Sequence, residues 1–172
     1  IDVITDFRSR DVAAGGQGAP LVPAFHRIVF GSDRPRAVVN IGGISNVTAL
    51  DGERVTGFDA GPGNVLIDGW MAAHFDAAFD AGGALAATAS PDEELVDALL
   101  SDPFFSLAPP KSTGRDLFTL EWVRRFERAR QIDTRVVLAS LTELTARSIG
   151  DAMMRWVPEA EDVVVCGGGA RN

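Results

Sequence analysis

Three short glycine-rich segments each follow a strand-like run or a strand meander. They are residues 40–46 (NIGGISN), 57–64 (GFDAGPGN) and 167–172 (GGGARN). A phosphate or nucleotide that packs against backbone amides requires residues without a Cβ atom, because only then can the chain approach it closely. One such segment alone is most simply a tight turn, whereas three at strand ends favour a ligand-binding cleft. Neither a P-loop nor a GxGxxG motif opening a helix is present, which disfavours the common nucleotide-binding folds.

Asp59 belongs to the second glycine-rich segment, at the predicted end of a strand. A carboxylate in that place can accept a proton from a hydroxyl group or a water molecule, which is the role of a general base. The alternative is an Asp whose side chain hydrogen-bonds to the turn that follows it. The residue and its neighbours leave both interpretations open.

Other polar residues give weaker signals. Residues 111–115 (KSTGR) follow two prolines and offer two cations and two hydroxyl groups. This segment could contact an anionic ligand, but we expect an ordinary solvated loop. His26 and His74 lack the spacing of metal ligands, and we interpret both as structural or exposed.

Composition excludes several classes of protein. The chain has 172 residues, 16 basic and 24 acidic, with a formal net charge of −8. A general nucleic-acid or anionic-membrane binder is disfavoured, because phosphate binding needs clustered cations. The single cysteine, Cys166, excludes an internal disulfide and a cysteine-rich zinc site. No apolar run approaches the roughly 20 residues that span a bilayer, and the first residues do not resemble a signal peptide, so we expect a cytoplasmic protein.

The hydrophobic pattern predicts an α/β fold. Residues 37–58 are typical of three short strands joined by tight turns, which is an antiparallel meander. Helical spacing predicts helices at 64–75, about 91–101, 117–129 and, longest of all, 134–157. Residues 163–166 (VVVC) predict a buried strand. This order is compatible with the ribonuclease-H-like half-domain of actin-like ATPases and sugar kinases.

Two details concern the middle of the chain. Ser90, followed by Pro91 and by Glu93 three residues after it, predicts the N-terminal cap of the second helix. Pro103, Pro109 and Pro110 are expected to keep the segment after that helix extended.

Taken together, these segments resemble the anhydro-N-acetylmuramic acid kinase family, in the actin-like, sugar-kinase and Hsp70 ATPase superfamily. The matching stretches cover essentially the whole chain in the family's order. They are residues 6–8 with 10–11, 15–23, 40–46, 57–64, 109–115, 144–149 and 166–172.

The resemblance implies a ribonuclease-H-like actin/sugar-kinase ATPase fold, of which this chain holds most of the second domain. Residues 1–36 are then the connection from a first domain, and residues 37–172 the second domain. That domain has a helical insertion at about 76–130 and is truncated at its C-terminus. Family members begin with a glycine- and Ser/Thr-rich phosphate loop that does not occur in this sequence. We therefore expect the chain to be inactive alone.

The resemblance also implies an activity. Family members use ATP and Mg²⁺ to convert 1,6-anhydro-N-acetylmuramic acid to N-acetylmuramic acid 6-phosphate, opening the anhydro bridge with water, in cell-wall recycling in the cytoplasm. The implied partners are the amino sugar and ATP, with no nucleic acid and no membrane, and the implied assembly is a homodimer. The roles implied by position are a catalytic base at Asp59, sugar binding at Arg8, and nucleotide binding at Asn40, Gly42, Gly43, Gly167, Gly168 and Gly169. One small departure is Ala60, where the family usually has Thr.

Two alternatives remain at this point. The first is another sugar kinase of the same superfamily that acts on a different hexose or amino sugar. The second is a non-catalytic ATP-binding module that senses a ligand without transferring phosphate.

Overall fold

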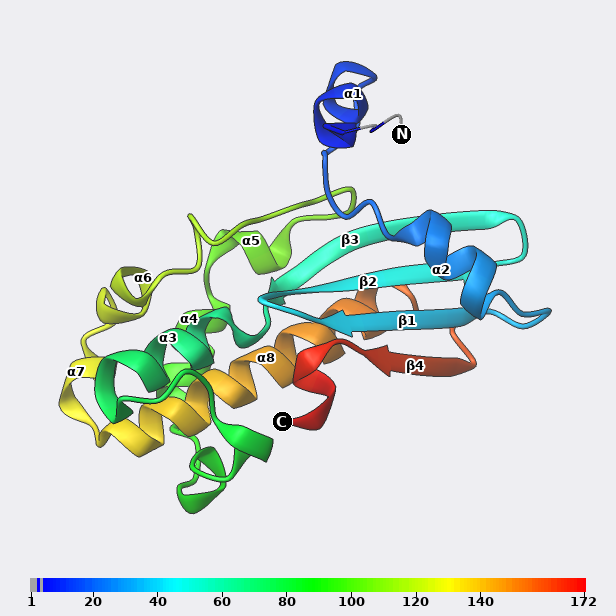
Figure 1. Ribbon diagram of the computed structural model, residues 1–172. Helices are drawn as coiled ribbons and strands as arrows, with labels where there is room; N and C mark the ends of the chain where they lie inside the picture. The colour runs from blue at the N-terminus through cyan, green and yellow to red at the C-terminus, as the bar shows by residue number, and fades with distance from the viewer. Residues whose placement is uncertain (1–2, 4) are drawn as a thin grey trace.

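A computed structural model describes residue 3 and residues 5–172 of the chain, and its centre is a four-stranded sheet (Figure 1). The strands are β1 (Arg36–Ile41), β2 (Ile44–Asp51), β3 (Arg54–Pro62) and β4 (Asp162–Cys166), in the spatial order β3-β2-β1-β4. The first three pair antiparallel, which confirms the predicted meander, and β4 pairs parallel with β1.

Two predictions about the strands need correction. Strand β3 runs to Pro62, so Asp59 lies inside the strand and not after it. Strand β4 is not fully buried, because Val163 and Val165 are 50% and 52% exposed. β4 is an edge strand of the sheet. A run of valines predicts a strand, but it does not reveal how many sides of that strand the rest of the molecule covers.

The helices follow the predicted order with different lengths. They are α1 (Phe7–Ala13), α2 (Pro23–Phe30), α3 (Asn64–Phe75), α4 (Glu93–Leu100), α5 (Pro103–Ser106), α6 (Leu120–Arg124), α7 (Arg128–Gln131) and α8 (Thr134–Trp156). Short 3₁₀ turns lie at 81–83, 86–88 and 168–171. The helices predicted at 64–75 and 134–157 are confirmed, whereas the one predicted at 117–129 is two short helices.

Local capping explains two further differences. Asp92, not Ser90, caps α4, because its carboxylate accepts a hydrogen bond of 2.9 Å from the N–H of Leu95. Both residues are good capping types, and sequence alone did not separate them. Pro103 is the first residue of α5, a position where its missing N–H costs nothing, so that stretch is not extended throughout.

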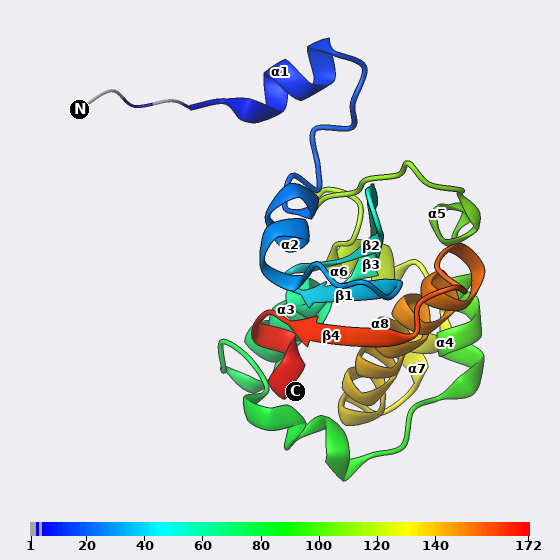
Figure 2. The ribbon, with the colours of Figure 1, turned by 90° about the vertical axis from the view of Figure 1, so that its right-hand side faces the viewer.

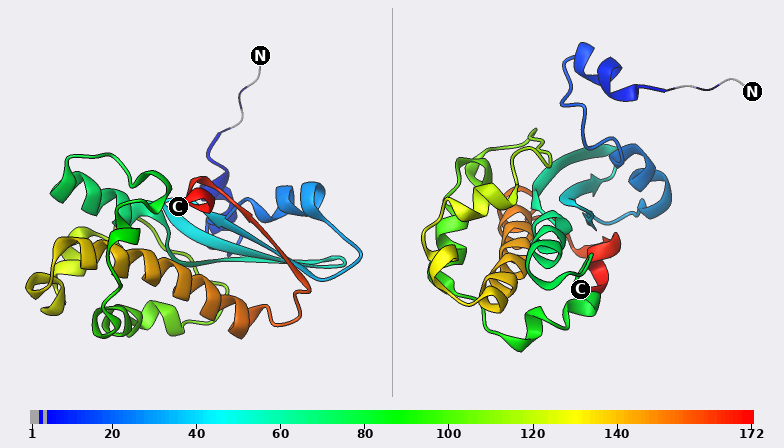
Figure 3. Two further views of the ribbon diagram at one scale, coloured as in Figure 1. Left: turned by 90° about the horizontal axis from the view of Figure 1, so that it is seen from below. Right: turned by 60° about the vertical axis from the view of Figure 1, so that its left-hand side comes forward.

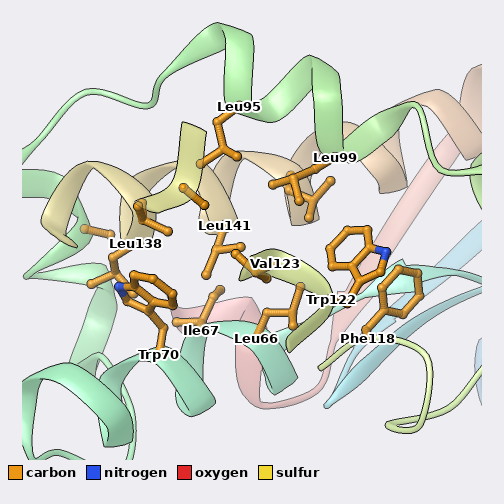
Figure 4. Packing of buried hydrophobic residues seen from close by; sticks show 14 of the residues in the cluster. Leu66, Ile67, Trp70, Leu95, Leu99, Phe118, Trp122, Val123, Leu138 and Leu141 are labelled. Carbon is orange, nitrogen blue, oxygen red and sulfur yellow. The ribbon is translucent and has the colours of Figure 1, made fainter. Parts of the chain in front are cut away.

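Helix α8 joins two hydrophobic cores. Its C-terminal half, with Ile149, Met153 and Trp156, packs against the sheet residues Val39, Val47 and Phe58. Around its N-terminal half, α3, α4, α6 and α7 gather at one end of the sheet (Figure 3). Their larger core is drawn in Figure 4 and includes Leu66, Trp70, Leu99, Trp122 and Leu141.

The opposite face of the sheet carries α2 (Figure 2). His26 of α2 is buried, and its Nδ1 lies 2.9 Å from Oγ1 of Thr48 on β2. His74 stacks on Trp70 with the two ring centroids 4.1 Å apart. Both histidines therefore make structural contacts, as the sequence indicated. The structure does not test the assignment of residues 1–36 as a connection or of 76–130 as an insertion, and both stay predictions.

Candidate functional site

The three glycine-rich turns lie at one edge of the sheet, the one formed by the C-terminal ends of β1, β3 and β4. The parallel strands β1 and β4 end side by side, with Asn40 opposite Cys166. Gly42 and Gly43 join β1 to β2 at this edge. Strand β3 also ends there, since Pro62 pairs with Ile44. The C-terminal ends of β1, β3 and β4 and the start of α3 thus surround a single region of the molecule.

Backbone contacts between the turns are tight. The N–H groups of Gly63 and Asn64 donate to the carbonyl oxygens of Gly43 and Gly42, at 2.9 and 2.8 Å. A Cβ atom on Gly63 would collide with the carbonyl oxygen of Gly42, and one on Gly167 would lie 2.5 Å from that of Ile41. Gly167 also has a φ of +88°, which side chains disfavour. These glycines are required so that three backbone segments can meet.

A cavity opens beside these turns. It has a volume of about 420 Å³ and is lined by Asn64, Asp68, Phe79, Gly168 and Arg171, among others. Backbone amides and polar side chains therefore meet an exposed aromatic ring within one hollow. Such a mixture is typical of small-molecule sites.

Asp59 lies on β3, two residues before Gly61, and is only 4% exposed. Its backbone N–H donates to the carbonyl oxygen of Lys111 at 3.0 Å. Its carboxylate atom Oδ2 accepts a hydrogen bond of 2.8 Å from the N–H of Thr113. The loop after α5, and not the Gly61-Pro62-Gly63 turn, therefore holds this carboxylate in place.

The electrostatic surroundings of Asp59 are mixed. Burial raises the pKa of Asp59 above its usual value, while the hydrogen bond from Thr113 and the charges of Arg8 and Lys111 lower it. A carboxylate whose pKa is raised is a better proton acceptor than an ordinary surface Asp. Carboxylates with a perturbed pKa are typical of functional sites.

Two polar atoms next to Asp59 have no partner. Among the described residues, Asn46 Oδ1 and Thr113 Oγ1 are buried and form no hydrogen bond. Asn46 is directly opposite Asp59 across strands β2 and β3, at a β-bulge. Buried polar atoms nearly always have partners in folded proteins. Two unpartnered ones beside a buried carboxylate are typical of a place where water or a ligand hydroxyl binds.

Residues 111–115 do not form the solvated loop that we expected. Lys111 is only 4% exposed, because the loop crosses the edge of β3 and turns the lysine inward. Arg115 stays exposed, and its guanidinium lies beside Gly43, 3.4 Å from where a Cβ atom would be. The loop therefore contributes one buried cation and one exposed cation to the site.

Of the other predicted residues, Asn40 and Gly169 lie at the same edge and Arg8 does not. Asn40 ends β1 beside Gly167. Gly169 packs against Ile41 and Asn64. Arg8 lies on the exposed helix α1, which stands apart from the sheet (Figure 2), and its charge acts on Asp59 across space.

Sequence reasoning missed four residues of this region: Asn46, Asp68, Lys111 and Thr113. Asn46, Lys111 and Thr113 stand in the glycine-rich segment 40–46 and in the segment 111–115. The burial of their side-chain polar atoms depends on the pairing of β2 with β3 and on the path of the loop. Asp68 is one helical turn after Asn64, and that spacing could have placed both on one face of α3.

The fold and this edge together define a class of protein, the sugar-kinase group of the actin-like ATPase superfamily. A sequence profile for anhydro-N-acetylmuramic acid kinase matches residues 1–172. The chain belongs to that family.

Individual relatives agree with this assignment. The chain is 52% identical to an anhydro-N-acetylmuramic acid kinase of Xanthomonas oryzae pv. oryzae (strain MAFF 311018) and 53% identical to one of Pseudomonas paraeruginosa. A third, from Cupriavidus metallidurans, is 50% identical. Each match covers 100% of this chain but only 46%, 48% and 47% of those relatives, in that order. The chain thus spans about half the length of the curated relatives it matches.

Within the part of the chain that the structure describes, no group of three or more His, Cys, Asp or Glu residues could hold a metal ion. Over the same residues, no helix is long and apolar enough to cross a membrane.

Proposed function

We propose that the protein containing this chain is an ATP-dependent kinase that converts 1,6-anhydro-N-acetylmuramic acid to N-acetylmuramic acid 6-phosphate. Family membership supports the reaction. The observation that supports a site for this reaction in the chain is Asp59. Its carboxylate is buried, and a loop holds it at the edge where three glycine turns meet.

Asp59 would act as the general base in this reaction. It takes a proton from a water molecule as the water oxygen bonds to C1 of the sugar. The bond between C1 and O6 breaks, and O6 bonds to the γ-phosphorus of ATP while ADP leaves. Asn46 and Thr113 support this role, because their unpartnered oxygens stand beside Asp59 and can bind that water.

The glycine turns would bind the nucleotide. Backbone amides without neighbouring Cβ atoms can approach phosphate oxygens closely. We assign this contact to Asn40, Gly42 and Gly43 on one side and to residues 167–169 on the other. The cavity lined by Gly168 and Phe79 lies next to them and can accept the nucleoside.

Mg²⁺ fits this arrangement. In kinases it is held mainly by phosphate oxygens and waters, with one or two carboxylates. Asp68 lines the cavity next to Gly168, so its carboxylate would supply an oxygen ligand. The ion would neutralise charge on the phosphates.

Two arginines would contact anionic groups. Arg8, through its charge near Asp59, is assigned to the sugar. Arg115 lies beside Gly43 and forms no ion pair within the described part of the chain, so it can meet a phosphate. Phosphoryl transfer depends mostly on positioning and on charge stabilisation, which these groups supply.

The cytoplasm is the proposed location, because the reaction consumes ATP. A homodimer is the proposed assembly, on the family resemblance. Sedimentation of the complete gene product would test the dimer directly, and a single species of monomer mass would contradict it.

The central test is an assay of sugar-dependent ADP release by the complete gene product. We expect turnover with the anhydro sugar and little with N-acetylglucosamine or glucose. The chain of residues 1–172 alone should be inactive. Higher turnover with glucose than with the anhydro sugar would identify a different sugar kinase. ATP binding without sugar-dependent turnover would identify a sensing module.

The assignment of Asp59 is tested by Asp59→Asn. The amide keeps the shape of the side chain but cannot take a proton, so kcat should fall by about 10²–10⁴-fold, while nucleotide affinity changes little. The matched control is Asp33→Asn, an exposed Asp in the loop between α2 and β1. Near-normal kcat in Asp59→Asn would place the base elsewhere.

A further inference from the structure

Lys111 is a buried cation that the proposed reaction does not use. Its side chain is enclosed, and Nζ donates a hydrogen bond of 3.1 Å to the carbonyl oxygen of Phe104. The ammonium group also lies over the ring of Phe104, 4.4 Å from the centroid. Within the described residues it forms no ion pair with a carboxylate.

Burying a charge without an ion pair is costly. One carbonyl oxygen and one aromatic ring offset only part of that cost. An apolar residue such as Met would fill the same space with no such penalty. Lys111 is therefore explained better by its effect on neighbouring residues than by a contribution to the stability of the fold.

The neighbour that it affects is Asp59. The carbonyl oxygen of Lys111 accepts the backbone N–H of Asp59, and two residues later the N–H of Thr113 donates to Oδ2 of the same residue. Residues 111–113 thus hold Asp59 by both its backbone and its carboxylate. The Lys111 side chain fixes this loop to α5 through Phe104.

We infer that Lys111 is a positioning residue: it anchors the loop that orients Asp59 and keeps the Asp59 carboxylate negatively charged in a buried place. The inference rests on the proposed role of Asp59 as the base.

The charges around Asp59 and Lys111 agree with this role. Burial raises the pKa of Asp59, while the positive charges of Arg8 and Lys111 lower it. Burial also lowers the pKa of Lys111, as does the charge of Arg155, whereas Asp59 raises it. Arg155 and Asp151 of α8 line a small hollow together with Lys111. On β2 the residue facing Asp59 is the uncharged Asn46.

The expected effect of removing the cation has a definite sign. Without Lys111 the pKa of Asp59 rises, so the carboxylate becomes protonated at higher pH. A general base works only when it is unprotonated. The acidic limb of the kcat–pH profile should therefore move to higher pH in Lys111→Met and stay close to its wild-type position in Lys111→Arg.

The test uses the complete gene product with four variants: Lys111→Met, Lys111→Arg, Asp59→Asn and the double variant Asp59→Asn/Lys111→Met. Arg130→Met is the matched control, because it removes an exposed cation on α7, a helix that packs against α4 and α6. Lys111→Met should lower kcat by about 10–100-fold at neutral pH, an effect within the range of general-base catalysis. In the Asp59→Asn background the same substitution should change kcat by less than about threefold, because the base is already absent.

The outcomes separate the possible failures. An inactive wild-type protein, or a fully active Asp59→Asn, would overturn the proposed function. An active wild type, an impaired Asp59→Asn and a Lys111→Met with an unmoved acidic limb would overturn only the role of Lys111. Equal losses from Lys111→Met in both backgrounds would also overturn it, since a general structural defect acts independently of Asp59.

A second variant covers the case in which Lys111→Met does not fold. Thr113→Pro removes the N–H that donates to Asp59 and leaves the contacts of Lys111 with Phe104 in place. The acidic limb should again move to higher pH, because the lost hydrogen bond stabilised the charged carboxylate. An unchanged limb in a folded Thr113→Pro would contradict the inference.

Discussion

At the scale of single residues, the candidate site depends on polar atoms that the fold leaves unpartnered. Thr113 Oγ1 and Asn46 Oδ1 are buried without a hydrogen bond in the part of the chain that the structure describes, and Asp59 lies between the segments that carry them. Burial of an unpaired hydroxyl group costs stability. A bound water or substrate that hydrogen-bonds to this hydroxyl would account for its position beside a buried carboxylate.

Thr113→Val tests that explanation, because valine has nearly the same shape and lacks the hydroxyl. Removing an unpaired hydroxyl breaks no hydrogen bond within the protein, so the melting temperature should stay the same or rise slightly. The backbone N–H that holds Asp59 remains. Activity should fall by about tenfold, the loss of about 1.4 kcal/mol that one hydrogen bond to the reacting water can supply. Calorimetry and ADP release on the complete gene product measure the two effects.

The opposite pattern would contradict this view of Thr113. If Thr113→Val lowered the melting temperature clearly and left kcat unchanged, the hydroxyl would have a structural partner and no part in the reaction. Ser112→Ala is the matched control. It removes the neighbouring hydroxyl, whose only hydrogen bond in the described part of the chain is a long one of 3.5 Å to the carbonyl oxygen of Gln17.

At the scale of elements, strand-end turns and the start of α3 determine where the site forms. Gly63 stands between β3 and α3, and its N–H bonds to Gly43. Gly150 lies within α8 and has no atom within 4 Å of the place where a Cβ would be. The two glycines therefore give opposite predictions for substitution by alanine.

Gly63→Ala should destabilise the protein and Gly150→Ala should stabilise it. The new methyl group at 63 collides with the carbonyl oxygen of Gly42, and relieving such an overlap costs about 1–3 kcal/mol. At 150 the helix gains about 0.5–1 kcal/mol, because alanine has the higher helix propensity. Urea unfolding of both variants measures the difference. Equal effects of the same sign would show that the turn at 42–43 adapts to a side chain.

Elements with strong local signals were predictable from the sequence, and features set by distant contacts were not. The meander and α8 follow from tight turns and from a long periodic pattern, which are local properties. The exposure of Val163 and the burial of Lys111 depend on which elements pack beside them. The three glycine turns could be expected at one edge, but the loop that holds Asp59 could not, because it is 52 residues further along the chain.

At the scale of the whole molecule, charge is distributed unevenly. The chain carries a net charge of −8, yet Lys111 and Arg115 lie near the edge that carries Asp59 and the glycine turns, and the charge of Arg8 acts on Asp59 as well. Local cations in an otherwise acidic protein direct an anionic ligand to one place. The edge of the sheet is therefore the part of this molecule best suited to bind phosphate groups.

Helix α8 makes the two hydrophobic cores depend on each other. Leu144 is fully buried in the helical core, and the same helix packs Ile149 and Met153 against the sheet.

Leu144→Ala should lower the free energy of unfolding by about 2–5 kcal/mol. If the cores unfold together, amides in β1 and α3 should lose protection from hydrogen exchange by the same free energy. Met154→Ala, at a side chain that is 71% exposed, is the control and should change stability by less than about 0.5 kcal/mol. Loss of protection in α3 alone would mean that the sheet, with its Asp59, is stable without the helical core.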